Sequence, residues 1–151
     1  MSWSARLAEL GIELPPVAAP VAAYVPAVRT GSLVYTAGQV PMVQGTLAAS
    51  GKVGAEVSEA EATELARTCG LNALAAVHNL VGIDSVVRIV KVVGFVASAE
   101  GFTAQPAVLN GASELFGEIF AEAGVHARSA VGVAELPMGA PVEVELIVEV
   151  A

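Results

Sequence analysis

Residues 86–96, with the sequence VVRIVKVVGFV, constrain the fold more than any other segment. The run is almost entirely apolar and rich in β-branched residues, with only Arg88 and Lys91 carrying charge. This pattern is typical of a strand that is buried on both faces. Such a strand needs neighbours on either side and cover above and below, so we expect the rest of the chain to build a sheet around it.

Three segments have the apolar spacing of helices. The clearest covers residues 58–82, where SEAE forms a capping box and Gly82 provides an end. Its predicted apolar stripe consists of Leu65, Cys69, Leu74, Val77 and Val81. A second helix is predicted over 104–123, with Pro106 in its first turn and a core face of Leu109, Phe116 and Phe120. A short helix is predicted over 2–11, from Trp3, Leu7 and Leu10 and the terminal Gly11.

Four further strands complete the pattern. Residues 21–28 and 33–39 are predicted to form strands joined by RTGS, and a Gly-punctuated loop that can hold a short strand follows at 44–54. The last two strands lie in HARSAVGVAELPMGAPVEVELIVEV, residues 126–150. Arg128 shares one face with only Ala130, Gly132 and Ala134, and the final strand alternates valines with Glu143, Glu145, Ile147 and Glu149. Antiparallel pairing of these two strands would bring Arg128 towards the glutamates, although their register stays open.

This order predicts an α+β fold within a single domain covering residues 1–151. We expect one mixed or antiparallel sheet of five or six strands, two long helices on one face, a short N-terminal helix, and an arm over residues 1–20. The other face of the sheet is also apolar, at Val90, Val92 and Val96 or their neighbours. Nothing in the chain remains to cover it, so we expect other subunits to do so.

Composition excludes several classes of protein. The net charge is −8 with only seven Lys and Arg residues, which argues against nucleic-acid binding. No apolar run is long enough for a membrane span, and residues 1–16 lack the apolar core of a secretory signal. The only cysteine, Cys69, cannot form an intrachain disulfide, and we expect a cytoplasmic protein.

Few residues have the spacing that catalytic or metal chemistry requires. His78 falls inside the predicted helix and is expected to be a packed or surface residue, whereas His126 lies in a loop two residues before Arg128 and is a candidate ligand contact. No His or Cys pair has metal-ligand spacing, Cys69 is expected in the core, and the loop at 45–54 lacks a phosphate-binding pattern. We therefore expect neither a metal nor a cofactor.

Arg128 and the acids of the last strand have two interpretations. One is a cross-strand salt bridge on a solvated edge, which would contribute little. The other is a binding site for a small carboxylic acid, because a guanidinium offers a planar fork and its face carries small residues. A nearby carboxylate, from Glu143 or Glu145, could then hold a water molecule or transfer a proton.

At these residues the chain resembles the YjgF/RidA family from about residue 21 to residue 151. RSAVGVAELP followed by PVEVEL is similar to the family's Arg-Ser-x-Val-x-Val-Ala-x-Leu-Pro segment and its Val-Glu strand. YVPAVRTGSLVYTAGQVP, residues 24–41, resembles a second family pattern. The segments LNGAS and GVHARSAVGV, together with the N-terminal arm, resemble a longer-chain branch of the family.

The resemblance implies a chorismate-mutase-like fold and a homotrimer with a site in each subunit cleft. It implies hydrolysis of reactive enamines or imines, such as 2-aminoacrylate, to 2-keto acids and ammonia. By their places in the motifs, Arg128 matches the arginine for the substrate carboxylate, Glu143 the acid that positions water, and Tyr24 a tyrosine contributed by a neighbouring subunit. Gly38 belongs to the matched Gly-Gln turn, and Asn110, or else Gln105, stands nearest to a substrate-contacting asparagine.

The sequence also departs from the family pattern. Ala130 replaces a frequent cysteine, Ala37 replaces a serine, and an aspartate after the Phe-Val strand is missing. A trimeric protein that binds small carboxylic or 2-keto acids without catalysis is therefore the alternative. A ribonuclease is disfavoured by the acidic charge and the lack of a His/Lys pair, and a chorismate mutase would need more cations than Arg128.

Overall fold

The computed structural model describes residues 1–17, 19–20 and 22–151. Five strands form one mixed sheet in the order β1-β2-β7-β5-β6. Their bounds are Ala27–Thr30 (β1), Leu33–Thr36 (β2), Val86–Ala97 (β5), Ala127–Val133 (β6) and Val142–Val150 (β7). All neighbouring pairs are antiparallel except β5 and β6, which run parallel. A separate hairpin consists of β3, Met42–Val43, and β4, Thr46–Leu47.

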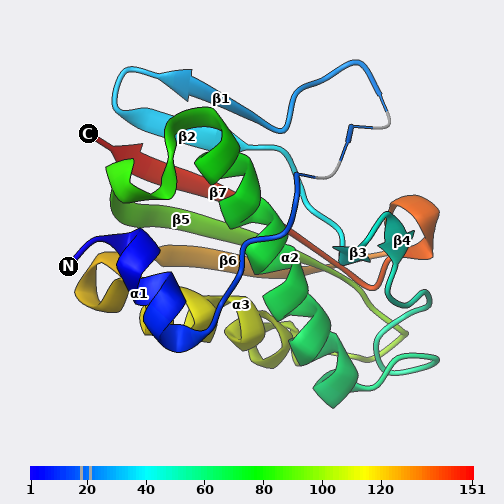
Figure 1. The fold of residues 1–151 in the computed structure, drawn as a ribbon. Helices are drawn as coiled ribbons and strands as arrows, with labels where there is room; N and C mark the ends of the chain where they lie inside the picture. Colours follow the sequence, from blue (N-terminus) through cyan, green and yellow to red (C-terminus); the bar gives the residue numbers. More distant parts are fainter. Residues whose placement is uncertain (18, 21) are drawn as a thin grey trace.

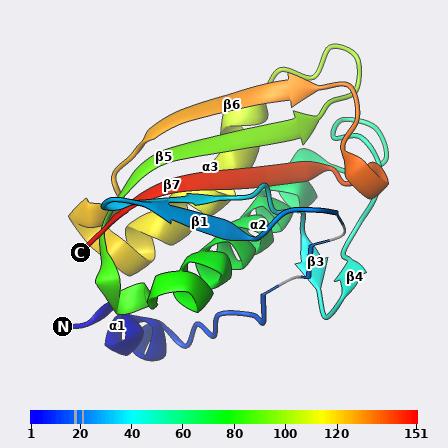
Figure 2. The ribbon, with the colours of Figure 1, turned by 90° about the horizontal axis from the view of Figure 1, so that it is seen from above.

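The two long helices lie side by side on one face of the sheet (Figures 1 and 2). These are α2, Glu59–Val81, and α3, Gln105–Phe120, and the short helix α1, Trp3–Leu10, packs against α3. The chain has an α+β architecture, with the helices on one face of a mixed sheet. The predicted fold class is therefore confirmed, with five strands in the main sheet.

The predicted helix ends are explained by local capping. The Ser58 hydroxyl accepts a hydrogen bond from the Glu61 N–H at the start of α2, and Ser2 does the same for Ala5 in α1. Gly11 ends α1 with φ +68°, a conformation that favours glycine. Helix α3 ends earlier than predicted, at Phe120, because residues 121–124 continue as a 3₁₀ turn.

Small residues set the distance between the layers. Gly94 of β5 lies directly beneath Leu109 of α3, where even a methyl group would collide with the leucine. Gly111 of α3 lies against the backbone carbonyl of Thr63 in α2, so the two helices are in close contact at this point. The core between the layers holds fully buried Leu74 and Phe116 from the helices.

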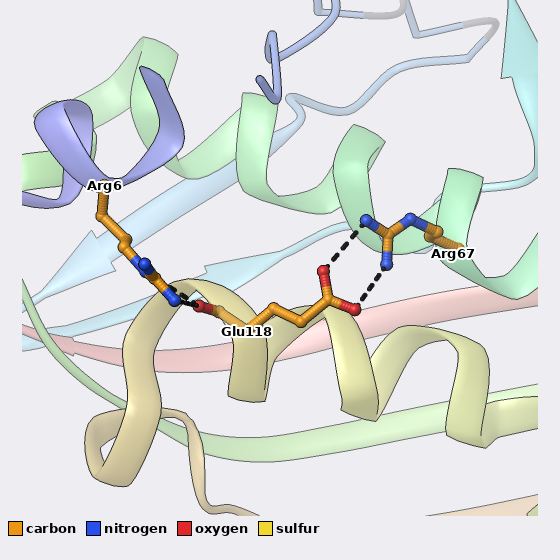
Figure 3. Close-up of polar contacts among 3 residues, drawn as sticks. All are labelled: Arg6, Arg67 and Glu118. Carbon is orange, nitrogen blue, oxygen red and sulfur yellow. Dashed lines mark hydrogen bonds and ion pairs between the residues drawn. The ribbon is translucent and has the colours of Figure 1, made fainter. Parts of the chain in front are cut away.

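Polar contacts join the three helices at one end of the molecule. Glu118 of α3 accepts two hydrogen bonds from Arg67 of α2, both at 3.2 Å, and its backbone carbonyl accepts from Arg6 of α1 (Figure 3). The Asp84 carboxylate accepts from the Ser4 N–H and hydroxyl near the start of α1, and these bonds lower the pKa of Asp84. These contacts attach α1 to both α3 and the turn before β5.

The arrangement of the last two strands differs from the sequence-based expectation. Strands β6 and β7 are not paired with each other, because β5 lies between them. Arg128 is level with Val92 of β5, which in turn is level with Leu146 of β7. The first of the two interpretations, a cross-strand salt bridge, is ruled out within the chain, because Arg128 lies on the helix-facing side of the sheet whereas Glu143 and Glu145 lie on the other side.

Other strand boundaries and faces also need correction. Residues 22–26 are not in a strand, Val21 lies outside the described residues, and β2 ends at Thr36. Val92 and Val96 face the helices and are fully buried. The apolar side chains on the opposite face are their neighbours Val93 and Phe95, together with those on adjoining strands, among them Val28, Tyr35, Val131 and Ile147. Of these, Val28, Tyr35 and Val131 are 52, 40 and 44 % exposed.

The close contact between α2 and α3 gives a test of the packing. Gly111→Ala would push a methyl group into the Thr63 carbonyl, and we expect the free energy of unfolding to fall by about 1–3 kcal/mol. Gly117→Ala in the same helix meets nothing within 4 Å and should raise it by roughly 0.5–1 kcal/mol. Urea denaturation of both variants checks this, and a neutral Gly111→Ala would contradict the packing.

Candidate functional site

Arg128 of β6 reaches across to α3 and is held there by three hydrogen bonds. Its Nη1 donates to Asn110 Oδ1 at 2.9 Å and to Ser113 Oγ at 3.1 Å, and Nη2 donates to the Pro106 carbonyl at 3.2 Å. Among the described residues it has no carboxylate partner. The guanidinium is therefore fixed by neutral acceptors and keeps its full positive charge available.

Two N–H donors of the Arg128 guanidinium remain without a partner in the described part of the chain. The group has five N–H donors, and the contacts with Pro106, Asn110 and Ser113 use three of them. The two that remain are the Nε–H and one N–H on Nη2, and these two nitrogens flank the same edge of the planar group. That edge can bind a carboxylate through two parallel hydrogen bonds.

The sequence around Arg128 explains why α3 can approach so closely. Ala130 and Gly132 follow on the same face of β6, and a Cβ at Gly132 would lie only 2.8 Å from Gln105 Nε2 at the start of α3. The small residues predicted beside Arg128 therefore accommodate a helix of the same chain. Pro106, Asn110 and Ser113 are spaced four and three residues apart, so they share one face of α3.

Glu143 of β7 lies on the opposite face of the sheet, beside Gly38. The loop after β2 is joined to β7 by hydrogen bonds between the backbones of Gln39 and Val144, at 2.8 and 3.0 Å. Gly38 is thereby brought against the Glu143 carboxylate, which occupies the space that any side chain at position 38 would need. Partial burial, and secondarily the charge of Glu145, raises the pKa of Glu143.

Tyr24 and Gly38 line the same cavity, which has a volume of about 510 Å³. Its walls come from the proline-rich segment after α1, the loop after β2 and residues near β3. Asn72 of α2 also lines it, and its Nδ2 donates to the carbonyls of Val40 and Met42, which fixes the loop. Tyr24 itself is 48 % exposed.

Within one chain, the predicted site residues thus form two separate groups. Arg128, Asn110 and His126 belong to the group at α3, whereas Tyr24, Gly38 and Glu143 lie around the loop after β2. From the register, Glu143 is two strands across and three residues along from Arg128. That separation is about 14 Å between Cα atoms, on opposite faces of the sheet. A single chain therefore does not bring Arg128 and Glu143 together.

The remaining polar candidates have structural partners. His126 Nε2 lies 2.9 Å from Ser113 Oγ, and His78 Nδ1 accepts a hydrogen bond from the Ile83 N–H just after α2. Cys69 is fully buried, as expected, and this burial raises the pKa of its thiol. Among the described residues no three His, Cys, Asp or Glu side chains gather as a metal site would require, and no helix is long and apolar enough to cross a bilayer.

Ser113 was not identified from the sequence. It contacts both Arg128 and His126, and so connects two residues that were identified. Its spacing of three residues from Asn110 on a predicted helix was the available signal. The signal was weak because nothing in the sequence indicates which face of α3 lies against β6.

Comparison with known proteins identifies the family. Residues 4–150 match the family described as "YjgF/chorismate mutase-like, putative endoribonuclease". The chain belongs to the YjgF/RidA family. The resemblance found in its motifs is thereby confirmed, and it extends to the N-terminal arm.

Individual relatives cover almost the whole chain. It is 43 % identical to Protein TCP17 of Trypanosoma cruzi over 97 % of this chain and 92 % of that protein. A protein of unknown function from Agrobacterium tumefaciens is 42 % identical, with a TM-score of 0.91 over 99 % of this chain and 92 % of the other. The structure of E. coli TdcF with bound serine is 26 % identical, with a TM-score of 0.65 over 91 % and 94 %.

The contact between Gly38 and Glu143 can be tested through the titration of the carboxyl group. We expect Glu143 to titrate above the ordinary carboxyl range in the parent protein, because burial disfavours its charged form. Gly38→Ala should push the carboxylate towards solvent and lower its pKa without unfolding the chain, since only the end of a flexible side chain must move. Carboxyl ¹³C NMR measures this, with Gly117→Ala as control. An unchanged titration in Gly38→Ala would contradict the contact.

Proposed function

We propose that this protein hydrolyses reactive enamines or imines of small amino acids, such as 2-aminoacrylate, to 2-keto acids and ammonia. The observation that carries the proposal is the free Nε/Nη2 edge of Arg128, held in place by Asn110, Ser113 and Pro106. This edge suits the carboxylate that every such substrate and its 2-keto acid product carry. The bound serine in the related TdcF supports a small amino-acid-like ligand in this family.

Glu143 is the group proposed to act on water. Its raised pKa makes the carboxylate a better proton acceptor than an exposed glutamate. In the proposed reaction, the enamine takes up a proton from water at carbon and reacts as the protonated imine. Water adds to the imine carbon while Glu143 takes one of its protons, which gives a neutral carbinolamine. Glu143 then returns this proton to the nitrogen, the C–N bond breaks as the hydroxyl group releases its proton to water, and the products are a 2-keto acid and ammonia.

The separation of Arg128 from Glu143 supports a site shared between two copies of the chain. We propose a homotrimer in which Arg128 and Asn110 of one copy face Tyr24, Gly38 and Glu143 of the next. The exposed apolar side chains on the outer face of the sheet, including Tyr35 and Val131, support assembly because exposed apolar surface of this kind marks an interface. An obligate interface of this type would bury more than about 2,000 Å² in total.

A non-catalytic carboxylate-binding protein is the second candidate. It is favoured by Ala130, which occupies a position where the family often has a cysteine, and by Ala37 before the Gly-Gln turn. The Arg128 edge would bind a 2-keto acid in either case. An endoribonuclease, which the family description includes, is less well supported, because a net charge of −8 opposes binding of a phosphate backbone.

Turnover separates the enzyme from the binding protein. A dehydratase that generates 2-aminoacrylate beside this protein should give faster release of ammonia and pyruvate. Glu143→Gln should lower this rate by roughly 10²-fold with little effect on pyruvate binding, whereas Glu145→Gln is the matched control and should change the rate little.

Arg128→Lys should weaken pyruvate binding by about 1.5–3 kcal/mol, because lysine keeps the positive charge but lacks the planar fork of the guanidinium. Pyruvate binding without any acceleration would support the binding protein.

Mixing two inactive variants tests whether the site is shared. Sedimentation should first show a particle three times the 15.2 kDa mass of the chain. Equal amounts of Arg128→Ala and Glu143→Gln subunits are unfolded together and refolded. The mixture should recover about a quarter of the parental activity. This recovery arises because a quarter of the interfaces then join an intact Arg128 to an intact Glu143. No recovery above the separate variants, in trimers shown to be mixed, would refute a shared site.

A further inference from the structure

A chain of hydrogen bonds continues behind Arg128, on the side away from its free edge. Arg128 Nη1 donates to Ser113 Oγ at 3.1 Å, Ser113 Oγ lies 2.9 Å from His126 Nε2, and His126 Nδ1 lies 2.6 Å from the Gly124 carbonyl oxygen. The chain thus links β6, α3 and the 3₁₀ turn Ala121–Gly124. None of these contacts is explained by the reaction proposed for Arg128 and Glu143.

The direction of every bond in this chain follows from its two ends. The Gly124 carbonyl can only accept, so His126 Nδ1 must carry a proton. In a neutral imidazole the other nitrogen, Nε2, is then an acceptor, and the Ser113 hydroxyl must donate to it. The lone pairs of Ser113 Oγ are left to accept from Arg128, which can only donate. With a neutral imidazole, this is the one arrangement that matches all of these donors and acceptors.

The imidazole is also held from the side. The ring of Phe116 in α3 meets it edge-to-face, with centroids 5.9 Å apart and an interplanar angle of 79°. Phe116 is fully buried in the core, so it cannot move aside without disturbing α3. His126 therefore has a packed ring face and a partner at each nitrogen, and these partners assign the Nδ1–H tautomer to the neutral ring.

We propose that Ser113 and His126 are positioning residues that hold Arg128 with its Nε/Nη2 edge turned towards the ligand carboxylate. An arginine side chain has many rotamers, and ordering it in advance lowers the entropic cost of binding. Asn110 and Pro106 also accept hydrogen bonds from Arg128. Ser113 differs from them because its hydroxyl is itself oriented by a further residue, His126. This inference rests on the proposed function in one respect, that the ligand of Arg128 is a carboxylate.

This series of hydrogen bonds predicts that a ligand bound to Arg128 changes the hydrogen bonding of His126. A carboxylate on Arg128 partly neutralises the guanidinium and weakens its pull on the Ser113 lone pairs. The bond from the Ser113 hydroxyl to His126 Nε2 then changes in strength, because linked hydrogen bonds polarise one another. A residue with only a packing role would show no such response to a ligand that it does not touch.

Binding measurements on variants of Ser113 test the positioning role. Pyruvate is the probe, in calorimetric titrations of the full-length protein. We expect Ser113→Ala to weaken pyruvate binding by about 3- to 10-fold, because one of the three hydrogen bonds that orient Arg128 is lost. Ser113→Thr, which keeps the hydroxyl, should stay within about two-fold of the parent. Thr68→Ala, which removes a hydroxyl bonded to the Glu64 carbonyl in α2, is the control and should leave binding unchanged.

The ring nitrogens of His126 give an independent readout by ¹⁵N NMR. At a pH of about 8.5, where imidazole groups are ordinarily neutral, we expect a protonated Nδ1 and an unprotonated Nε2. Pyruvate should shift the Nε2 signal in the parent protein but not in Arg128→Ala or Ser113→Ala.

Three outcomes would overturn the inference. A protonated Nε2 would contradict the direction of the bonds, and undiminished pyruvate binding by Ser113→Ala would remove the positioning role. Both would leave the proposed function standing. Failure of the parent protein to bind pyruvate at all would instead refute the carboxylate site of Arg128, and the inference with it.

Discussion

The insertion of β5 between β6 and β7 decides where the polar groups of this protein lie. Strand β5 is the longest strand of the sheet and pairs in parallel with β6 and antiparallel with β7. Its presence moves Arg128 and Glu143 two strands apart, and the alternation of side chains turns them to opposite faces. Arg128 therefore contacts α3, whereas Glu143 contacts the loop after β2.

Small residues make both environments possible. Gly94, Ala130 and Gly132 allow α3 to lie close to β5 and β6, so that a side chain from β6 can reach Asn110 and Ser113. Gly38 does the same for Glu143 by leaving room for its carboxylate against the backbone. In each case a missing side chain supplies the space in which a charged group is oriented. A site of this kind depends on close backbone packing as much as on its polar residues.

The energetic character of the two groups also differs. Arg128 is surrounded by neutral acceptors, which stabilise its orientation without neutralising its charge. Glu143 is partly buried and lies near a second carboxylate, so its charged form is disfavoured and its pKa is raised. Among the described residues, Arg128 has no acidic partner and Glu143 has no basic one, so these charges on opposite faces of the chain are complementary. This is the physical basis for proposing that two copies complete one site.

The sequence by itself determined the elements, the class of fold and the family, because periodicity, capping and turn residues act locally. SEAE and Gly11 set helix ends, and the motif around Arg128 carried the resemblance. Only the tertiary structure decided the strand order, the face that Arg128 occupies and the role of Ser113. These depend on which strand lies between β6 and β7 and which face of α3 meets the sheet, and such contacts between distant segments leave no local trace in the chain.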